Sequence, residues 1–242
     1  MSGFRFSFPA CVIAGKGRIM SDDILTLRKY AFPDGIRFSE EADILFALNA
    51  SCPEPSPEWA TYFVESLSAY VVRNSGTAGV IDDKKSRWLQ GALSRNGAIR
   101  SELGLELLLH AMEIANEVEE SLFAFALDQL LLALQPQPRG AYASLRPPSP
   151  GVSEFDLAYV WRVLRPALVR GRLMLSPLEA EVLRKIDHLA PTGAHHAAWQ
   201  EMIGMMMTLD RPDDPLRNDR WLAIDNRSLL DGAGYNFSDA LH

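Results

Sequence analysis

Cysteine is almost absent from this sequence, since Cys11 and Cys52 are the only two among 242 residues. Two cysteines so far apart in sequence cannot supply the disulfide framework of a small secreted scaffold or the ligand spacing of a zinc knuckle. The stretch from Arg5 to Ala14 resembles an export signal only faintly, because its apolar run is short and Pro9 interrupts it. We therefore expect a reducing, cytoplasmic location. Translation from Met20 is an alternative start, which would leave the preceding residues out.

An excess of positive charge and a long apolar run are also missing. The chain has 24 basic and 31 acidic side chains and a net charge of -7, whereas binding to nucleic acid needs clustered Lys and Arg that displace counterions. The longest strongly apolar stretch, from Leu122 to Leu134, falls short of the roughly 18 residues of a membrane-spanning helix. We expect neither nucleic acid nor a membrane as a partner.

Local catalytic motifs are the third absence. The sequence has no G-x-S-x-G nucleophile elbow, and neither cysteine lies in a recognisable catalytic context. The glycines near Lys16 and those at 232 and 234 lack the spacing and the preceding strand of a phosphate-binding loop. These absences favour a protein without catalysis. An enzyme whose site is assembled from distant helices stays open as an alternative.

A helical pattern occurs three times along the chain. Each time, a helical stretch ends at a glycine, a second helix opens on a serine, and a third helix follows. The glycines are Gly35, Gly97 and Gly171, and the serines that follow them are Ser39, Ser101 and Ser176. Ser176-Pro177-Leu178-Glu179 is a full capping box with proline at the first helical position. The repetition indicates related units of three helices.

This pattern predicts an all-α protein of about nine helices, in three three-helix units that form a helical bundle or a short solenoid-like stack. The expected parts are a loose extension (1–18), a helical body of two units (19–134), a linker rich in Pro and Gly (135–151), a third unit that repeats the first (152–210) and a polar tail (211–242). The apolar helix from Leu122 to Leu134 should be the central buried element. We expect buried side chains at Leu45, Phe63, Leu108, Leu130 and Leu183.

The first glycine turn has part of the spacing of a calcium-binding loop. Gly35 and Glu41 fit loop positions six and twelve of an EF-hand. The earlier ligand positions supply only one carboxylate, that of Asp34, where several oxygen ligands are needed. The favoured interpretation is a helix-turn-helix in which glycine provides the backbone conformation that ends the first helix.

The turn at Asp34-Gly35 is followed by Glu41, which opens the next helix, and similar turns recur in this acidic all-helical chain. This arrangement resembles the TerB-like helical domains associated with tellurite resistance and stress systems in bacteria. The resemblance implies a helical bundle whose acidic surface residues bind a divalent metal, with Asp34 and Glu41 as the ligands. The later turns hold Asn96 and Arg170 in place of the aspartate. A bacterial origin and a stress-response role follow from this resemblance alone.

The only histidine cluster is formed by His188, His195 and His196, with Asp187 alongside. Imidazoles with a carboxylate are plausible ligands for zinc or nickel. Their spacing matches no closed structural site, and adjacent histidines on a helix point about 100° apart. A polar loop between helices is therefore the favoured interpretation, with a metal site as the alternative.

Four methionines lie close together near the end of the third unit. Met202, Met205, Met206 and Met207 place soft side chains on one predicted helix. Filling of the core is the more common use of such residues, and an adaptable face for a partner protein, centred on Met202, Met205 and Met206, is the alternative.

Taken together, these patterns favour a cytoplasmic, non-catalytic interaction or adaptor protein that binds another protein and needs no cofactor, because repeated helices present grooves and no reactive constellation is evident. A TerB-like protein that binds a divalent metal or acts in stress response is the alternative, and an enzyme without a local motif is the third. The sequence leaves the oligomeric state open.

Overall fold

The computed structural model describes residues 12–52, 55–165, 168–169, 172–191, 193–209 and 222–225. The protein is 68% helical and 5% strand, which confirms the predicted all-α fold. No helix among these residues is both long and apolar enough to cross a membrane. Most of the expected N-terminal extension and polar tail lies outside the described residues.

The chain divides into two compact units. Unit 1 contains the chain up to Ile81 together with Glu106–Glu117, and unit 2 contains Asp82–Leu105 and the chain from Val118 onward. Residues 135–151, expected to be a linker, lie within unit 2 and include the short helix α8 (Ala141–Leu145). The side chain of Tyr142 on α8 is buried, so this segment contributes to the core of its unit.

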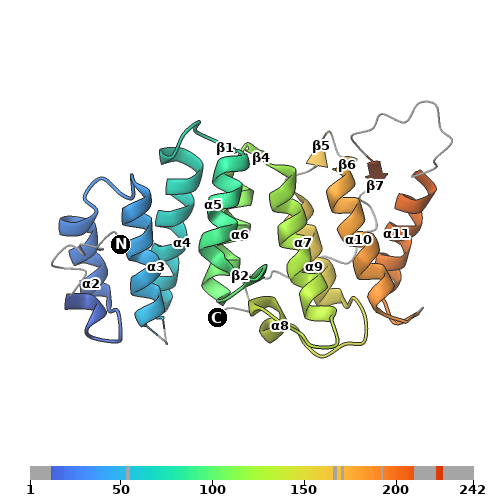
Figure 1. Cartoon of the computed structure of the whole chain (residues 1–242), viewed down its shortest axis with the longest axis horizontal. Coiled ribbons are helices and arrows are strands. Elements are labelled where there is room, and N and C mark those ends of the chain that lie inside the picture. The colour runs from blue at the N-terminus through green and yellow to red at the C-terminus, as the bar shows by residue number, and fades with distance from the viewer. Residues whose placement is uncertain are drawn as a thin grey trace. The chain divides into compact units, whose positions relative to one another are not determined.

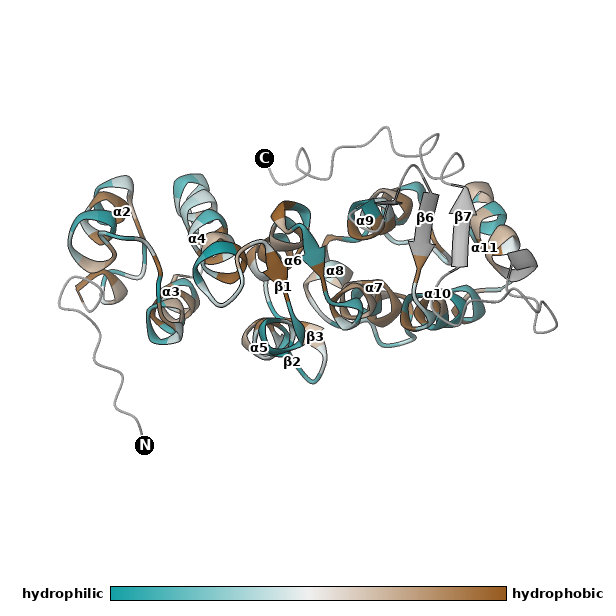
Figure 2. Cartoon of the chain, turned by 90° about the horizontal axis from the view of Figure 1, so that it is seen from above, coloured by the Kyte–Doolittle hydropathy of each residue, from teal (hydrophilic) through white to brown (hydrophobic). Residues whose placement is uncertain are grey.

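The elements of unit 1 are α2 (Ser21–Thr26), η1 (Leu27–Ala31), α3 (Ser39–Ser51), α4 (Pro57–Ala69), η2 (Tyr70–Asn74), β1 (Val80–Ile81) and most of α6 (Glu102–Ile114). The π-helical segments η1 and η2 continue α2 and α4 directly. Within this unit, α2 and α4 lie on one side and α3 lies on the other (Figure 2). The predicted core residues Leu45, Phe63 and Leu108 are buried, as expected.

The helices of unit 2 are α5 (Asp83–Leu93), the start of α6, α7 (Glu120–Leu134), α8, α9 (Glu154–Leu164), α10 (Pro177–Leu189) and α11 (Ala197–Leu209). Its strands are β2 (Ser94–Arg95), β3 (Ala98–Ile99), β5 (Leu168–Val169), β6 (Arg172–Leu175) and β7 (Leu222–Asp225). Strand β4 (Glu117–Val118) has its first residue in unit 1 and its second in unit 2. Helices α5, α7 and α10 form one layer of this unit, and α9 and α11 form the other (Figure 2). β6 pairs antiparallel with both β5 and β7.

Helix α7 is the central element of unit 2, as the sequence predicted. It packs against α5, α8, α9 and α10, and Figure 1 shows α7 and α10 side by side. Nine of its 15 residues are buried, which exceeds the single stripe of a surface helix. Leu130 on α7 and Leu183 on α10 are completely buried, which confirms the remaining core predictions.

Two tryptophans occupy matching places in the two units. Trp59 is the third residue of α4, and its indole Nε1 donates to Asn49 Oδ1 near the end of α3 at 3.0 Å. Trp199 is the third residue of α11, and its Nε1 donates to Asp187 Oδ1 near the end of α10, also at 3.0 Å. Both indoles are fully buried, so each N–H needs such a partner.

Amide side chains form hydrogen bonds with the backbone of two of the glycine turns. Asn74 Nδ2 donates to the carbonyl oxygen of Ile36 at 2.8 Å. On α7, Gln129 Nε2 donates to the carbonyl oxygen of Gly97 at 3.0 Å, and Gln129 Oε1 accepts from Ile99 N at 2.9 Å. Each amide comes from the third helix of its predicted unit. The same type of contact thus recurs at two glycine turns, and the triple repeat stays a prediction.

The second glycine turn is a tight hairpin that the helical pattern did not predict. Strands β2 and β3 pair with Ser94 opposite Ile99 and Arg95 opposite Ala98, leaving Asn96 and Gly97 as the two loop residues. Both have positive φ, 52° and 78°, which is the conformation that favours Asn-Gly in such hairpins.

Candidate functional site

The most extensively bonded polar group of unit 2 is the carboxylate of Asp156, in the first turn of α9. Ser153 is the N-cap of this helix, and its backbone N and its Oγ both donate to Asp156 Oδ2 at 2.8 Å. The backbone N of Asp156 donates in return to Ser153 Oγ at 3.4 Å. This capping box fixes the carboxylate where the helix begins.

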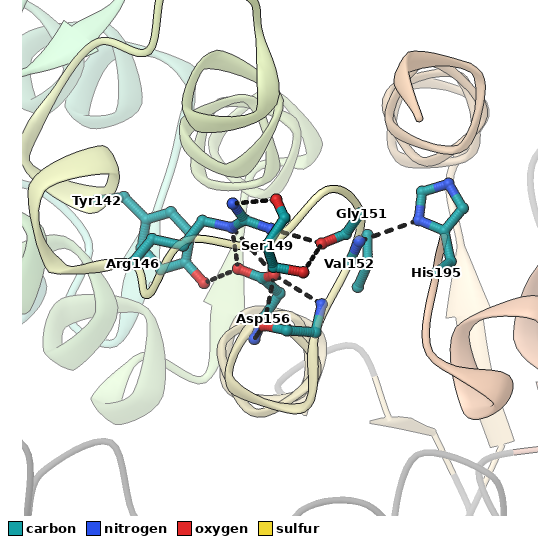
Figure 3. A network of polar contacts seen from close by, with 8 residues as sticks. Tyr142, Arg146, Ser149, Gly151, Val152, Asp156 and His195 are labelled. Atoms are coloured by element: carbon teal, nitrogen blue, oxygen red, sulfur yellow. Dashed lines mark hydrogen bonds and ion pairs between the residues drawn. The ribbon is translucent and has the colours of Figure 1, made fainter. Parts of the chain in front are cut away.

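Two side chains from α8 and the residue after it complete the surroundings of this carboxylate (Figure 3). Arg146 Nε donates to Asp156 Oδ1 at 2.8 Å and to Oδ2 at 3.0 Å, and Tyr142 OH donates to Oδ1 at 2.8 Å. The Asp156 side chain is fully buried and that of Arg146 is 7% exposed. Burial, followed by the charge of Asp156, holds the pKa of Tyr142 well above its ordinary value.

The same arginine also binds the loop that leads into α9. Arg146 donates from its terminal nitrogens to the carbonyl oxygens of Ser149, at 3.2 Å, and Gly151, at 2.5 Å. A Cβ at Gly151 would lie 2.6 Å from the carbonyl oxygen of Ala194, so only glycine fits this approach of two backbones. The arginine thus ties α8, the loop and α9 together.

His195 joins this loop to the segment between α10 and α11 (Figure 3). The backbone N of Val152 donates to His195 Nδ1 at 3.0 Å, and His195 Nε2 lies 3.0 Å from the carbonyl oxygen of Asp187. An accepting Nδ1 requires the proton on Nε2, which then donates to Asp187. Both ring nitrogens are therefore occupied.

The chemistry of this network is structural. The Asp156 carboxylate is charge-paired and accepts bonds on both oxygens, so neither its charge nor a lone pair is directed at a substrate position. The phenol of Tyr142 uses its proton in the same network. The network connects four segments of unit 2, which are α8, the loop before α9, the start of α9, and the connection between α10 and α11.

A hollow lies beside this network. Its volume is about 490 Å³, which falls within the size range of small-molecule sites. It is lined by Ala133, Leu134, Gln135, Pro138, Arg146, Pro148, Ser149 and Pro150. The Arg146 guanidinium that borders it is already bound to Asp156 and to backbone carbonyls, so the hollow gains no unpaired positive charge from this residue.

Glu179 is a second buried carboxyl group in unit 2. It closes the predicted capping box of α10, because its Oε2 accepts from the backbone N of Ser176 at 2.5 Å. Burial raises the pKa of Glu179 to about 7; the hydrogen bonds from Ser176 oppose this shift and the charge of Glu120 adds to it. The carboxyl group therefore titrates near neutral pH.

The residues that the TerB-like resemblance nominated are engaged in local contacts. Asp34 is exposed and lies 3.8 Å from a terminal nitrogen of Arg37. Glu41 Oε2 accepts from the backbone N of Arg37 at 2.7 Å and from that of Phe38 at 3.2 Å, as the cap of α3. Among the described residues, no group of three or more His, Cys, Asp or Glu side chains is arranged to hold a metal.

The predicted histidine cluster is spread over different surroundings. His188 is exposed in the last turn of α10, whereas His195 is buried with both nitrogens engaged. His196 is exposed, and its Nδ1 accepts from the backbone N of Ala198 at 3.2 Å. Of the three, His195 and His196 lie in the connection between α10 and α11, whereas His188 belongs to α10 itself.

The methionines nominated for partner binding lie mainly inside unit 2. Met202 and Met206 have no exposed surface, and Met205 is half-buried. Met207 lies where side chains are not described. Met202 and Met206 therefore belong to the packed core of unit 2. This is the core-filling role that the sequence offered as the more common use of such methionines.

A concentration of exposed apolar side chains is present in unit 1. Among the described residues, seven large apolar side chains are exposed, and five of them lie between residues 12 and 38. We call these five the N-terminal apolar surface: Val12, Met20, Leu25, Tyr30 and Phe38, which are 49%, 50%, 63%, 63% and 61% exposed. Exposed apolar side chains that gather in one region are a feature of contact surfaces, and these five come from one segment of unit 1.

Sequence reasoning missed both the Asp156 network and this surface. The Ser153-x-x-Asp156 spacing is a capping signal that points to Asp156. Arg146 carries no comparable signal, because it lies in a segment rich in proline and serine. The exposed apolar residues of unit 1 come from several elements, so their exposure depends on how those elements pack.

Comparison with known proteins identified no relative of this chain. No family model, no curated protein and no solved structure matches the chain.

Proposed function

We propose that this chain is a non-catalytic helical interaction or adaptor protein. The observation that carries the proposal is the N-terminal apolar surface of unit 1, where Leu25, Tyr30 and Phe38 are each more than half exposed. Exposing large apolar side chains is unfavourable in water, and a partner protein that covers them gains the corresponding free energy.

The chemistry of the surface fits a protein partner. Protein interfaces are enriched in aromatic residues, Met and Arg relative to the rest of the surface. The segment 12–38 offers Met20, Tyr30 and Phe38 together with exposed Arg18, Arg28 and Arg37. The charged groups of the Asp156 network are used within unit 2 itself, so they support the scaffold.

Site-specific photo-crosslinking tests the proposal. Tyr30 is replaced by the photo-reactive p-benzoylphenylalanine, and the protein is irradiated in a lysate of its native cells. A matched control carries the same group at Leu178, which is 45% exposed on α10 in unit 2. We expect a discrete adduct from position 30 and none from position 178. Equal labelling at the two positions, or no adduct at position 30, would contradict the proposal.

A further inference from the structure

The N-terminal apolar surface has a pair of unmatched cations beside it. Arg28 and Lys29 are consecutive exposed residues of η1. The guanidinium carbon of Arg28 lies 5.1 Å from the centroid of the Tyr62 ring, and Lys29 Nζ lies 5.1 Å from that of Tyr30. Within the described part of the chain, neither cation forms an ion pair with a carboxylate. We call these two residues the basic pair.

The next helix carries a pair of unmatched carboxylates. Glu40 is exposed and Asp43 is half-buried in the first two turns of α3. Burial and then the charge of Glu40 raise the pKa of Asp43, and burial followed by the carboxylates of Glu40, Asp43 and Glu41 raises the pKa of Tyr70. No ion pair among the described residues neutralises Glu40 or Asp43. We call these two residues the acidic pair.

The charged pairs and the apolar side chains lie on consecutive elements of unit 1. Leu25 and Tyr30 belong to α2 and η1, and Phe38 is the N-cap of α3. Figure 2 shows α2 and α3 as neighbouring helices of this unit. Unit 1 therefore carries exposed apolar side chains together with the basic pair on η1 and the acidic pair at the start of α3.

A surface of this composition is complementary to itself. In a dimer with two-fold symmetry, residue i of one copy meets residue j of the other, and j meets i. A two-fold axis that brings η1 of one copy against α3 of the other forms this contact between opposite charges twice. Electrostatic complementarity of this type directs partner choice and orientation more than it adds raw affinity.

We propose that the N-terminal apolar surface binds a second copy of this chain in a two-fold symmetric dimer, with the basic pair of each copy facing the acidic pair of the other. This deepens the proposed function and rests on it, since it names the partner of the same surface. The dimer buries Leu25, Tyr30 and Phe38 and neutralises four charges on each copy.

Sedimentation equilibrium of the full chain tests the dimer directly. The chain mass is 26.9 kDa, so we expect twice this mass at about 100 µM and the monomer on sufficient dilution. Raising the salt from about 50 to about 500 mM screens the charged pairs and should raise the dissociation constant at least about tenfold. A monomer at about 100 µM in low salt would overturn the proposal.

Two sets of substitutions locate the interface. The double variant Leu25→Glu, Tyr30→Glu should be monomeric at every concentration, because it places charge among the apolar side chains that the dimer would bury. The matched variant Leu178→Glu changes an exposed leucine of unit 2 and should dimerise as the unchanged protein does. Circular dichroism melts verify that each variant is folded. A dimer that survives Leu25→Glu, Tyr30→Glu uses another surface, and the proposal is then wrong.

Charge reversal supplies a test that loss of folding cannot imitate. The variant Arg28→Glu, Lys29→Glu and the variant Glu40→Lys, Asp43→Lys should each be monomeric, because like charges then face each other. Mixing the two should restore a dimer, since one copy offers only acidic and the other only basic pairs. Failure of the mixture to dimerise would overturn the proposed orientation.

The crosslinking experiment separates this inference from the function on which it rests. An adduct of position 30 with a second copy of this chain supports both. An adduct with a different protein, from a chain that sediments as a monomer, supports the interaction function and rejects the dimer.

Discussion

Arg146 and Asp156 form a buried ion pair that joins the residue after α8 to the first turn of α9, with Nε 2.8 Å from Oδ1 and 3.0 Å from Oδ2. Replacing Arg146 by Ala leaves the Asp156 carboxylate buried without a countercharge. We expect the free energy of unfolding to fall by about 3–5 kcal/mol, measured by urea denaturation.

The surface pair Arg87 and Asp83 is the matched control for that experiment, because both side chains are mostly exposed. Arg87→Ala should change the free energy of unfolding by less than about 1 kcal/mol. If Arg146→Ala has an effect as small as that of Arg87→Ala, the Asp156 network does not stabilise unit 2.

Gly151 and Gly91 should respond to alanine in opposite ways. At Gly151 a Cβ would lie 2.6 Å from a backbone oxygen of Ala194, and we expect a loss of about 1–3 kcal/mol from the resulting strain. At Gly91, inside α5, a Cβ meets nothing within 4 Å, and alanine should stabilise the helix by about 0.5–1 kcal/mol. Thermal melts of the two variants test both signs, and a neutral Gly151→Ala would contradict the close approach.

Glu179 should make stability fall as pH rises toward neutrality. Its folded pKa is about 7, above the ordinary value of 4.5, so the folded protein binds more protons than the unfolded chain between these values. The difference in unfolding free energy between the unchanged protein and Glu179→Gln should therefore decrease by about 3 kcal/mol from pH 4.5 to pH 7 and level off above it. Urea denaturation across this range measures it, and a difference that increases with pH would contradict the burial of this carboxyl group.

Glu41 should act as a helix cap whether or not metal is present. Glu41→Ala removes the acceptor for the backbone N–H groups of Arg37 and Phe38, and we expect a loss of about 1 kcal/mol. Thermal melts in chelator and in a series of divalent metals should give the same loss. A melting temperature that one metal raises, and that both Glu41→Ala and Asp34→Ala return to its metal-free value, would instead support the TerB-like alternative.

Much of the helical framework was predictable because its signals are local. Ser176 with Glu179 marked the start of α10, and the apolar composition around Leu130 marked α7 as the buried centre. The strands were not predicted, since β2 and β3 contain two residues each and arise from the turn at Asn96 and Gly97. Helix α8 is five residues long, too short for a periodic pattern, and the burial of Tyr142 depends on the folded unit.

The sequence by itself determined the all-α class, the main helices and the apolar positions that become the core, because spacing, capping residues and helix breakers act within one or two turns. Only the tertiary structure decided that His195 bonds Val152, 43 residues away, that Arg146 neutralises Asp156 within unit 2, and that Leu25 and Tyr30 stay exposed while Met202 and Met206 are buried. These outcomes depend on which helix faces which, and that is set by packing of the whole chain.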